Sequence, residues 1–501
     1  MRNPLFATKP LERLIAESQE TGEHSLKRTL GPMNLILLGI GAIIGAGLFV
    51  RTAAAAANNA GAGVTIGFVI AGLGCVFAGL CYAELASMIP VAGSAYTYSY
   101  ATLGEFVAWI IGWDLVLEYA LGAATVSIAW SEYLNRLLHM FGMSVPFQWS
   151  HSPFETLTDQ AGNAISHGIM NIPALFIIFI LTLLLIRGTK ESAIVNGIIV
   201  FAKVAIVLLI IFFGWGFINP ANHTPYIPPH SVYIDAQGVD HNFGGVVGLL
   251  GAAGVVFFAF IGFDAVSTAA QETKNPGKDM PIGILGSLAI CTVLYILFAH
   301  VLTGLAPVEF FRHAGKEASV AAAISTYMPG FSWLSNLVTV AILAGFSSVI
   351  LVMLMGQSRV FYSMSRDGLV PRTFASIHPK YRTPYKSNML FFVFVGLFAS
   401  FIPGDIVGDM TSIGTLFAFV LVSAGVIVMR RTNPNAKREF RAPMVPLVPI
   451  LGIVVCLSMI YGLGWANWAR LIVWLLIGFV IYFSYSRYHS VMATARAEAA
   501  K

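Results

Sequence analysis

Charged residues are scarce in this chain. Asp, Glu, Lys and Arg make up only 11% of its 501 residues, whereas 57% of the residues are hydrophobic. Because a soluble protein carries roughly 25% charged residues, this deficit excludes an ordinary water-soluble fold and predicts long segments that never face water. The net charge of +5 does not indicate nucleic-acid binding, since the basic residues stand in short clusters between apolar runs.

Cysteine-based and catalytic motifs are also lacking. The chain has four cysteines without CxxC or Cys/His spacing, which is typical of buried reduced thiols. No GxxxxGKS, HExxH or GxSxG motif occurs, so we expect neither an ATPase, a metalloenzyme nor a serine hydrolase, and no cofactor. The first 30 residues are polar, which excludes a cleavable signal peptide and makes the first apolar segment a signal anchor. The cysteines are Cys75, Cys81, Cys291 and Cys456.

Long apolar runs are what the sequence has in abundance. Twelve of them reach or approach the roughly 20 residues that a membrane helix needs. Placing the N-terminus in the cytoplasm leaves most of the 29 Lys and Arg residues on the cytoplasmic side, as the positive-inside rule requires. The sequence therefore predicts an all-α, multi-pass protein of the cell membrane, with about twelve transmembrane helices and both termini cytoplasmic. The runs lie near 34–55, 64–90, 103–135, 170–187, 195–217, 244–270, 281–306, 333–358, 388–402, 408–430, 445–464 and 466–486.

The first and sixth runs are unusually rich in glycine. The first contains GIGAIIGAGL at positions 39–48, and the sixth contains GAAGVVFFAFIGFD at positions 251–264. Close helix packing would explain such spacing. Glycine clusters at mid-membrane also indicate broken helices, whose free N–H groups suit a carboxylate and whose free carbonyls suit an ammonium group.

The position of these two runs predicts the domain organisation. Breaks in spans one and six imply a five-helix repeat, and an odd number of spans inverts the second repeat relative to the first. A six-plus-six arrangement would require a break in span seven, which shows none. The expected parts are a cytoplasmic tail (1–33), a first repeat (34–217), a second repeat (244–430), two added helices (445–486) and a cytoplasmic tail (487–501).

Two ionisable residues lie deep in predicted spans. Lys203 stands near the midplane of span five, where its ammonium must pair with carbonyls or lose its proton. We interpret it as a proton-coupling lysine, with a structural counter-ion as the alternative. Glu118 lies one helical turn after Asp114 in span three, on the same face. It could receive a substrate ammonium, relay a proton or brace a neighbouring helix.

For the other ionisable residues we expect roles in ion pairs or hydrogen bonds and not in substrate binding. Glu84, Asp264, Arg366 and Asp367 stand near predicted cytoplasmic ends, where ion pairs that gate the pathway or anchor loops are the expected role. His300 is a lone histidine in span seven, and a hydrogen-bonded structural role is expected for it. The large outer loops at 136–169 and 218–243 carry no catalytic motif.

The chain resembles the amino acid–polyamine–organocation superfamily, specifically bacterial relatives of the cationic amino acid transporters. The resemblance spans almost the whole chain. It implies a five-plus-five inverted repeat, alternating access and proton-coupled amino-acid uptake. The motifs that carry it are GIGAIIGAGLF, CYAELASMIPVAGSAYTYSYATLGEFVAWIIGWDLVLEY, FAKVAIVL, FFAFIGFDAVSTAAQETKNPGKDMPIGI and GQSRVFYSMSRDGLVP.

The resemblance also implies site residues. Lys203 matches a lysine that occupies the sodium position of sodium-coupled relatives, and Glu118 matches an acid near the substrate side chain. Relatives often carry Thr or Ser where Ala46 stands, so the backbone is expected to hold the carboxylate here. The implied carboxylate contacts are Gly45, Ala46 and Gly47, and the implied ammonium contacts are the carbonyls of Ile43, Phe258, Ala259 and Ile261, with Phe258 as an aromatic lid.

The predicted function is proton-coupled symport of neutral or cationic L-amino acids. An exchanger of amino acids or polyamines is the first alternative, and a transport-derived amino-acid sensor is a weaker one. The expected partners are an amino acid, a proton and membrane lipid, without nucleic acid or metal. The sequence leaves open a small single-span partner subunit.

Overall fold

The computed structural model describes residues 4–19, 26–45, 47–158, 164–234, 240–313, 319–462, 465–492 and 494. Within these residues the chain is a bundle of helices with two small β-hairpins. The hairpins lie in the two long loops at 136–169 and 218–243, which the sequence predicted only as polar segments. They pair β1 (Thr156–Thr158) with β2 (Ala164–His167) and β3 (Ser231–Ile234) with β4 (Asp240–Phe243), both antiparallel.

The helices of the first half include three segments with irregular hydrogen bonding. They are η2 (Gly47–Arg51), η3 (Ala56–Ala60) and η5 (Val116–Leu121), all of the wide π type, which often marks functional sites. The α-helices are α1 (Leu11–Gln19), α2 (Pro32–Ile43), α3 (Thr52–Ala55), α4 (Val64–Met88), α5 (Ala95–Thr102), α6 (Glu105–Leu115), α7 (Gly122–His139), α8 (Ile172–Arg187) and α9 (Thr189–Gly214).

The second half contains three tight 3₁₀ segments, η9 (Phe258–Phe260), η10 (Asp264–Glu272) and η11 (Arg372–Ala375). Its α-helices are α10 (Gly245–Phe257), α11 (Pro276–Leu305), α12 (Val308–His313), α13 (Ser319–Tyr327), α14 (Ser332–Arg366), α15 (Tyr385–Phe401), α16 (Gly404–Thr432), α17 (Leu447–Gly462), α18 (Trp465–Ile481) and α19 (Arg487–His489).

Among the described residues, eight helical stretches are long and apolar enough to cross a membrane, and four shorter helices are apolar as well. Helix α9 shows why the bundle needs lipid around it. Phe201 and Phe212 leave 77% and 76% of their surface exposed, whereas Lys203 on the same helix is fully buried. Apolar side chains outside and a charge inside reverse the pattern of a soluble protein. The predicted all-α, multi-pass membrane fold is thus confirmed, while the twelve-span inverted repeat stays a prediction.

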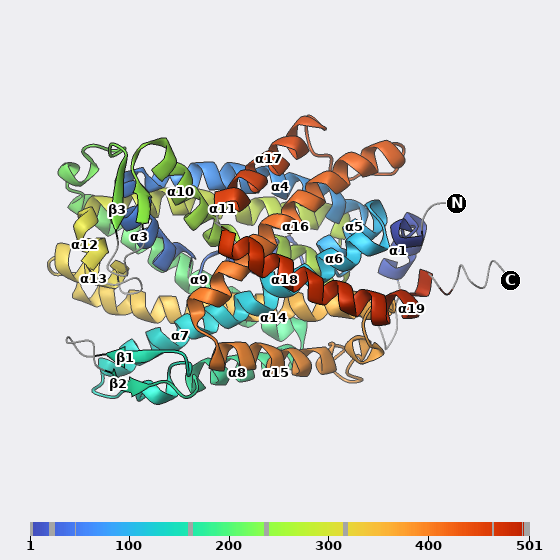
Figure 1. The fold of residues 1–501 in the computed structure, drawn as a ribbon, viewed down its shortest axis with the longest axis horizontal. Helices are drawn as coiled ribbons and strands as arrows, with labels where there is room; N and C mark the ends of the chain where they lie inside the picture. The colour runs from blue at the N-terminus through green and yellow to red at the C-terminus, as the bar shows by residue number, and fades with distance from the viewer. Residues whose placement is uncertain are drawn as a thin grey trace.

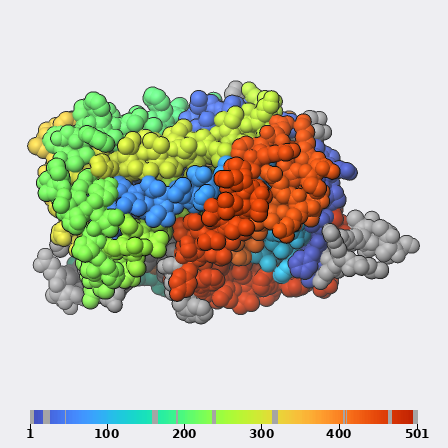
Figure 2. Space-filling view, turned by 90° about the horizontal axis from the view of Figure 1, so that it is seen from above, coloured from blue at the N-terminus to red at the C-terminus, as the bar shows by residue number. Residues whose placement is uncertain are grey.

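The bundle is elongated, and its two ends differ. Helices α1 and α19 lie at one end, which we call the terminal end (Figure 1). The β-hairpins, α12 and α13 lie at the opposite end, which we call the hairpin end (Figure 1). Helix α4 packs against α10, α11 and α17, and these helices are among those on the face seen in Figure 2.

Arg312 fastens the β3–β4 loop to η3 at the hairpin end. Its guanidinium donates a hydrogen bond to the carbonyl of Ala57 (3.0 Å) and lies 3.9 Å above the Tyr233 ring and 4.6 Å above the Phe243 ring. In the same loop, burial and the neighbouring His300 lower the pKa of His223. These contacts hold the β3–β4 hairpin over the end of η3.

Glu84 organises one buried ion-pair cluster. Its carboxylate, which is fully buried on α4, accepts hydrogen bonds from Nε (2.7 Å) and Nη2 (2.8 Å) of Arg430 on α16. It also accepts one from Nε of Arg438 (3.1 Å) and one from the backbone N–H of Ala442 (2.8 Å). One carboxylate therefore ties α4 to α16 and to the segment before α17, which is a loop-anchoring role.

We expect Glu84→Gln to destabilise the bundle, because it removes one charge and leaves the buried Arg438 guanidinium without its carboxylate. Breaking a buried ion pair in this way costs about 3–5 kcal/mol. Thermal unfolding in a fixed detergent measures the loss as a lower midpoint. Lys380→Gln serves as the control, because Lys380 is exposed and takes no part in the Glu84 cluster. Equal midpoints for the two variants would contradict the anchoring role.

Candidate functional site

The helical hydrogen-bond pattern of α2 stops in the middle of the bundle. Its last hydrogen bond runs from the N–H of Ile44 to the carbonyl of Ile40 (2.9 Å), and Ile44 then turns to an extended conformation (φ −76°, ψ 103°). The chain becomes helical again at Gly47, where η2 begins. A helix end leaves carbonyls without intrahelical partners, and these must be satisfied when water is excluded.

Lys203 satisfies part of the break in α2. Its ammonium donates to the carbonyls of Gly41 (2.9 Å) and Ile44 (2.7 Å) and to the hydroxyl of Ser348 on α14 (2.6 Å). The three donors of an ammonium thus meet three acceptors. The predicted pairing of Lys203 with carbonyls is what the structure shows, and the pairing links α9 to α2 and α14.

Tyr295 on α11 offers its single hydroxyl hydrogen to two further carbonyls. Its hydroxyl is placed between the carbonyl oxygens of Ile43 (2.7 Å) and Ala259 (2.8 Å), one from each glycine-rich run. Sequence reasoning missed both Tyr295 and Ser348. A tyrosine inside an apolar span is a usable signal, because its hydroxyl needs a partner when buried. The partner's identity depends on the fold.

The second glycine-rich run breaks as well. Helix α10 passes into η9, after which Ile261 is extended (ψ 134°) and Gly262 has φ +110°, a conformation that suits glycine. Helical turns resume at Asp264 in η10. The two breaks touch, since a methyl group added at Gly47 would overlap the Cα of Ala259. A glycine at position 47 is therefore required by this close approach of two backbones.

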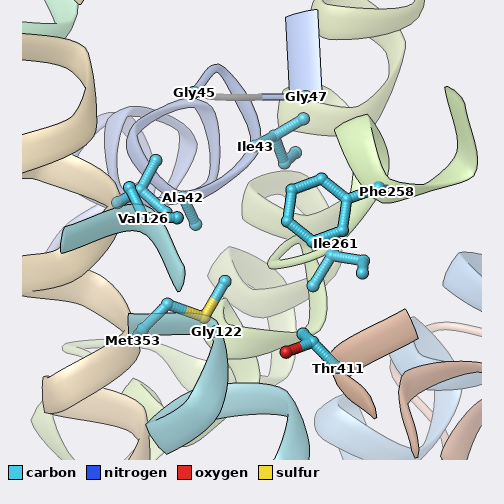
Figure 3. Close-up of a pocket in the computed structure, with 11 residues that line it drawn as sticks. Ala42, Ile43, Gly45, Gly47, Gly122, Val126, Phe258, Ile261, Met353 and Thr411 are labelled. Carbon is cyan, nitrogen blue, oxygen red and sulfur yellow. The ribbon is translucent and has the colours of Figure 1, made fainter. Parts of the chain in front are cut away.

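A small cavity lies between the two breaks (Figure 3). The space open to the centre of a water molecule is about 20 Å³, little more than the roughly 10–15 Å³ that one water needs. An amino acid can therefore enter only if the surrounding helices move apart. The lining residues are Ala42, Ile43, Gly45, Gly47, Gly122, Val126, Phe258, Ile261, Val349, Met353 and Thr411.

The cavity wall is apolar apart from backbone groups and one hydroxyl. The ring of Phe258 lies beside Ile43 and Ile261, and Thr411 lies below Ile261 in this view (Figure 3). The guanidinium of Arg51 stands 5.1 Å from the centre of the Phe258 ring, within the range of a cation–π contact. Phe258 is therefore held between the cavity and Arg51.

The structure brings most of the expected site residues together. Ile43, Gly45, Gly47, Phe258 and Ile261 line the cavity, while Ala46 falls outside the described residues. Ala259 does not line it, but its backbone contacts the Gly47 position and its carbonyl accepts from Tyr295. These roles in substrate binding remain predictions.

Glu118 is placed away from the cavity lining. It is fully buried in η5, and neither carboxyl oxygen has a hydrogen-bond partner among the described residues. Asp264 and Asp114, both fully buried, are its acidic neighbours. Asp264 accepts a hydrogen bond from the hydroxyl of Tyr119 (2.5 Å). This position fits a proton relay or a brace between helices better than contact with the substrate.

Buried ion pairs join helices between the cavity and the terminal end. Arg359 on α14 pairs with Glu272 on η10 (Nη2–Oε1 3.0 Å), and both side chains are fully buried. The chain just before α2 meets the end of η10 through hydrogen bonds from Leu30 N–H to Glu272 O (3.0 Å) and from Lys274 N–H to Leu30 O (2.9 Å). Both broken runs are therefore fastened to each other and to α14.

Asp367, at the end of α14, forms a second ion pair. Its carboxylate accepts from the ammonium of Lys9 (2.6 Å) and from the hydroxyl of Tyr96 (2.7 Å). Together with the Glu84 cluster, this contact places two of the acids expected at helix ends in loop-anchoring or gating pairs. His300 lies 3.4 Å from the Tyr226 hydroxyl, in keeping with a structural role.

Comparison with known proteins supports transport. A family model described as "Amino acid permease" matches residues 30–483. The chain is 45% identical to the branched-chain amino acid permease BcaP of Bacillus subtilis, over 98% of this chain and 99% of that protein. It is 40% identical to the methylthioribose transporter of B. subtilis (97% and 99%). It is 39% identical to cationic amino acid transporter 9, chloroplastic, of Arabidopsis thaliana (84% and 69%).

We expect Tyr295→Phe to slow uptake roughly tenfold, because two buried carbonyls would lose their shared donor and an unsatisfied buried group costs about 1–3 kcal/mol. Initial uptake rates in liposomes provide the measurement.

The matched control is Tyr82→Phe. The Tyr82 hydroxyl is equally buried but has no hydrogen-bond partner among the described residues, so its removal should leave uptake nearly unchanged. Similar rates for the two variants would show that the Tyr295 hydroxyl does not hold the two breaks.

Proposed function

We propose that this chain, which belongs to the amino acid permease family, imports neutral amino acids with branched aliphatic side chains by proton-coupled symport. Amino acid transport follows from the family. The coupling, the substrate class and the location in the cell membrane with both termini cytoplasmic are our proposals. The observation that carries the substrate class is the cavity between two broken helices, lined by backbone groups and aliphatic side chains.

The backbone at the breaks suits the common part of all amino acids. The N-terminus of η2 begins at Gly47, which suits a carboxylate, and the carbonyls near Ile43 and Ile261 suit an ammonium group. A sugar thioether such as methylthioribose has neither charge. The broken backbone suits a substrate that carries both a carboxylate and an ammonium group. We therefore give this backbone more weight than the printed name of the relative that is 40% identical.

The rest of the wall suits an aliphatic side chain. Val126, Val349 and Met353 line the cavity, and no carboxylate lines it in the described part of the chain. A cationic substrate would bury its charge there without a partner, which is costly. The branched-chain permease among the relatives supports the same substrate class. The sequence left cationic substrates open. They are disfavoured because Glu118 does not line the cavity and so does not face the substrate's side chain.

Lys203 is our proposed coupling group. Its ammonium holds the carbonyls of Gly41 and Ile44, which belong to the break itself. A neutral amine has fewer donors than an ammonium and binds these carbonyls less well. Loss of the proton would therefore loosen α2 from α9 at the substrate site. A pure exchanger, of amino acids or polyamines, has no need of such a group.

The substrate class can be tested with purified protein in liposomes. The proton gradient is directed inward, and a panel of twenty radiolabelled amino acids is offered as substrate. We expect leucine, isoleucine and valine to accumulate and arginine and lysine not to, with methylthioribose failing to compete.

Each alternative gives a different result in this panel. Accumulation of arginine above leucine would refute the neutral substrate class. Uptake that requires preloaded substrate would indicate an exchanger, and binding without any flux would indicate a sensor.

The coupling prediction concerns Lys203→Ala and the bulkier Lys203→Met. We expect both to abolish accumulation driven by a pH gradient while retaining substrate exchange at equal pH on the two sides. The two assays on the same liposomes separate coupling from folding. Lys386→Ala, on an exposed lysine at the start of α15, is the control. Full pH-driven uptake by Lys203→Ala would show that coupling lies elsewhere, and parallel loss of both activities would assign Lys203 a structural role.

A further inference from the structure

We propose that the terminal end holds a phosphate-binding site, separate from the substrate cavity, in a pocket that we call the basic pocket. Arg28, Lys274, Lys278 and Lys437 supply its positive charge, and Ser87 supplies a hydroxyl. The pocket measures about 580 Å³, against about 20 Å³ for the substrate cavity. It therefore accommodates a phosphate group, with its substituent, without any movement of helices.

Three separate segments build the basic pocket. Arg28 stands in the chain just before α2, Lys274 and Lys278 flank the start of α11, and Lys437 follows α16. Lys274 and Lys278 belong to the ETKNPGK part of the sequence, which lies away from the substrate cavity. The transport function proposed above therefore leaves this motif without a role.

The charge of the basic pocket favours an anion. Among the lining residues that the structure describes, Glu439 is the one acid, and basic side chains outnumber it. Glu439 lies 3.9 Å from Lys437 and against Gly277 in the first turn of α11, where the helix dipole favours negative charge. A phosphate group offers more acceptor oxygens and more negative charge than a carboxylate, so it suits lysine and arginine donors that come from different segments.

Other lysines of the terminal end are arranged differently. Lys380 and Lys386 lie over the rings of their neighbours Tyr381 (5.6 Å) and Tyr385 (5.9 Å), and neither lines the basic pocket. The clustering around one hollow is thus a property of the basic pocket and not of every basic loop. Because cytoplasmic membrane surfaces are rich in anionic phospholipids, a lipid headgroup is the nearest source of phosphate, and free phosphate is the other.

A bound phosphate would act on both broken runs. Arg28 stands two residues before Leu30, whose carbonyl accepts a hydrogen bond from the backbone N–H of Lys274 (2.9 Å). An anion that contacts Arg28 and Lys274 therefore reinforces the junction between the start of α2 and the end of η10. We expect it to stabilise the closed arrangement described here.

The test is thermal unfolding of the full chain in nanodiscs, which does not depend on transport. We compare phosphatidylcholine alone with phosphatidylcholine containing phosphatidylglycerol, and separately add inorganic phosphate against chloride of equal ionic strength. The pocket variant is Lys274→Gln with Lys278→Gln, and the charge-matched control is Lys380→Gln with Lys386→Gln. Lys437→Gln, on a side chain that is 89% exposed, is a second pocket variant in case the first folds poorly.

We expect phosphatidylglycerol to raise the unfolding midpoint of the native chain by roughly 2–4 °C, a rise that the pocket variants lose and the control keeps. A rise with inorganic phosphate that is lost in the same variants would support the site with a soluble ligand. Equal rises in native, pocket and control proteins would overturn the proposal, since they reflect general surface charge. So would the absence of any rise with either anion.

Discussion

The constraint on which this structure depends is that a helix stopped inside a membrane must have its free carbonyls satisfied by protein. At the break in α2, Lys203 takes the carbonyls of Gly41 and Ile44, and Tyr295 takes that of Ile43. Without such donors the broken backbone would cost more than a continuous helix. The break therefore exists only where α9, α11 and α14 bring donors to it, and the cavity exists only because of the break.

The same donors tie the breaks to helices that carry no break. Tyr295 connects both runs to α11, and Lys203 connects the first run to α9 and, through Ser348, to α14. Because the cavity admits about one water, substrate entry requires some of these contacts to give way. A hydrogen bond from an ammonium can be weakened by removing its proton, whereas the phenol of Tyr295 keeps its donor. This difference is the reason why we propose Lys203, and not Tyr295, as the coupling group.

Sequence reasoning reached the elements that depend on local pattern. It predicted the apolar runs, both glycine-rich breaks and the burial of Lys203. Span length, glycine content and the position of a charge within an apolar run can each be determined from residues that are close in the sequence. Tyr295, Ser348 and the partners of Glu84 could not be predicted in the same way. Their roles depend on which helices become neighbours, and one sequence without contacts does not contain this information. The hairpins were missed because short strands in polar loops give a weak periodic signal.

Glu118 shows how three-dimensional placement changes the meaning of a residue. In the sequence it is an acid deep in span three, which suggests a partner for a second substrate cation. In the structure Gly122 and Thr411 line the cavity, while Glu118 faces Asp264 at the start of η10. η10 is the half of the second broken run that Arg359 contacts through an ion pair and that the Leu30 segment contacts through backbone hydrogen bonds. An acid in that position neighbours η10 and does not line the cavity, and this is why we propose that the aliphatic wall, and not Glu118, selects the substrate.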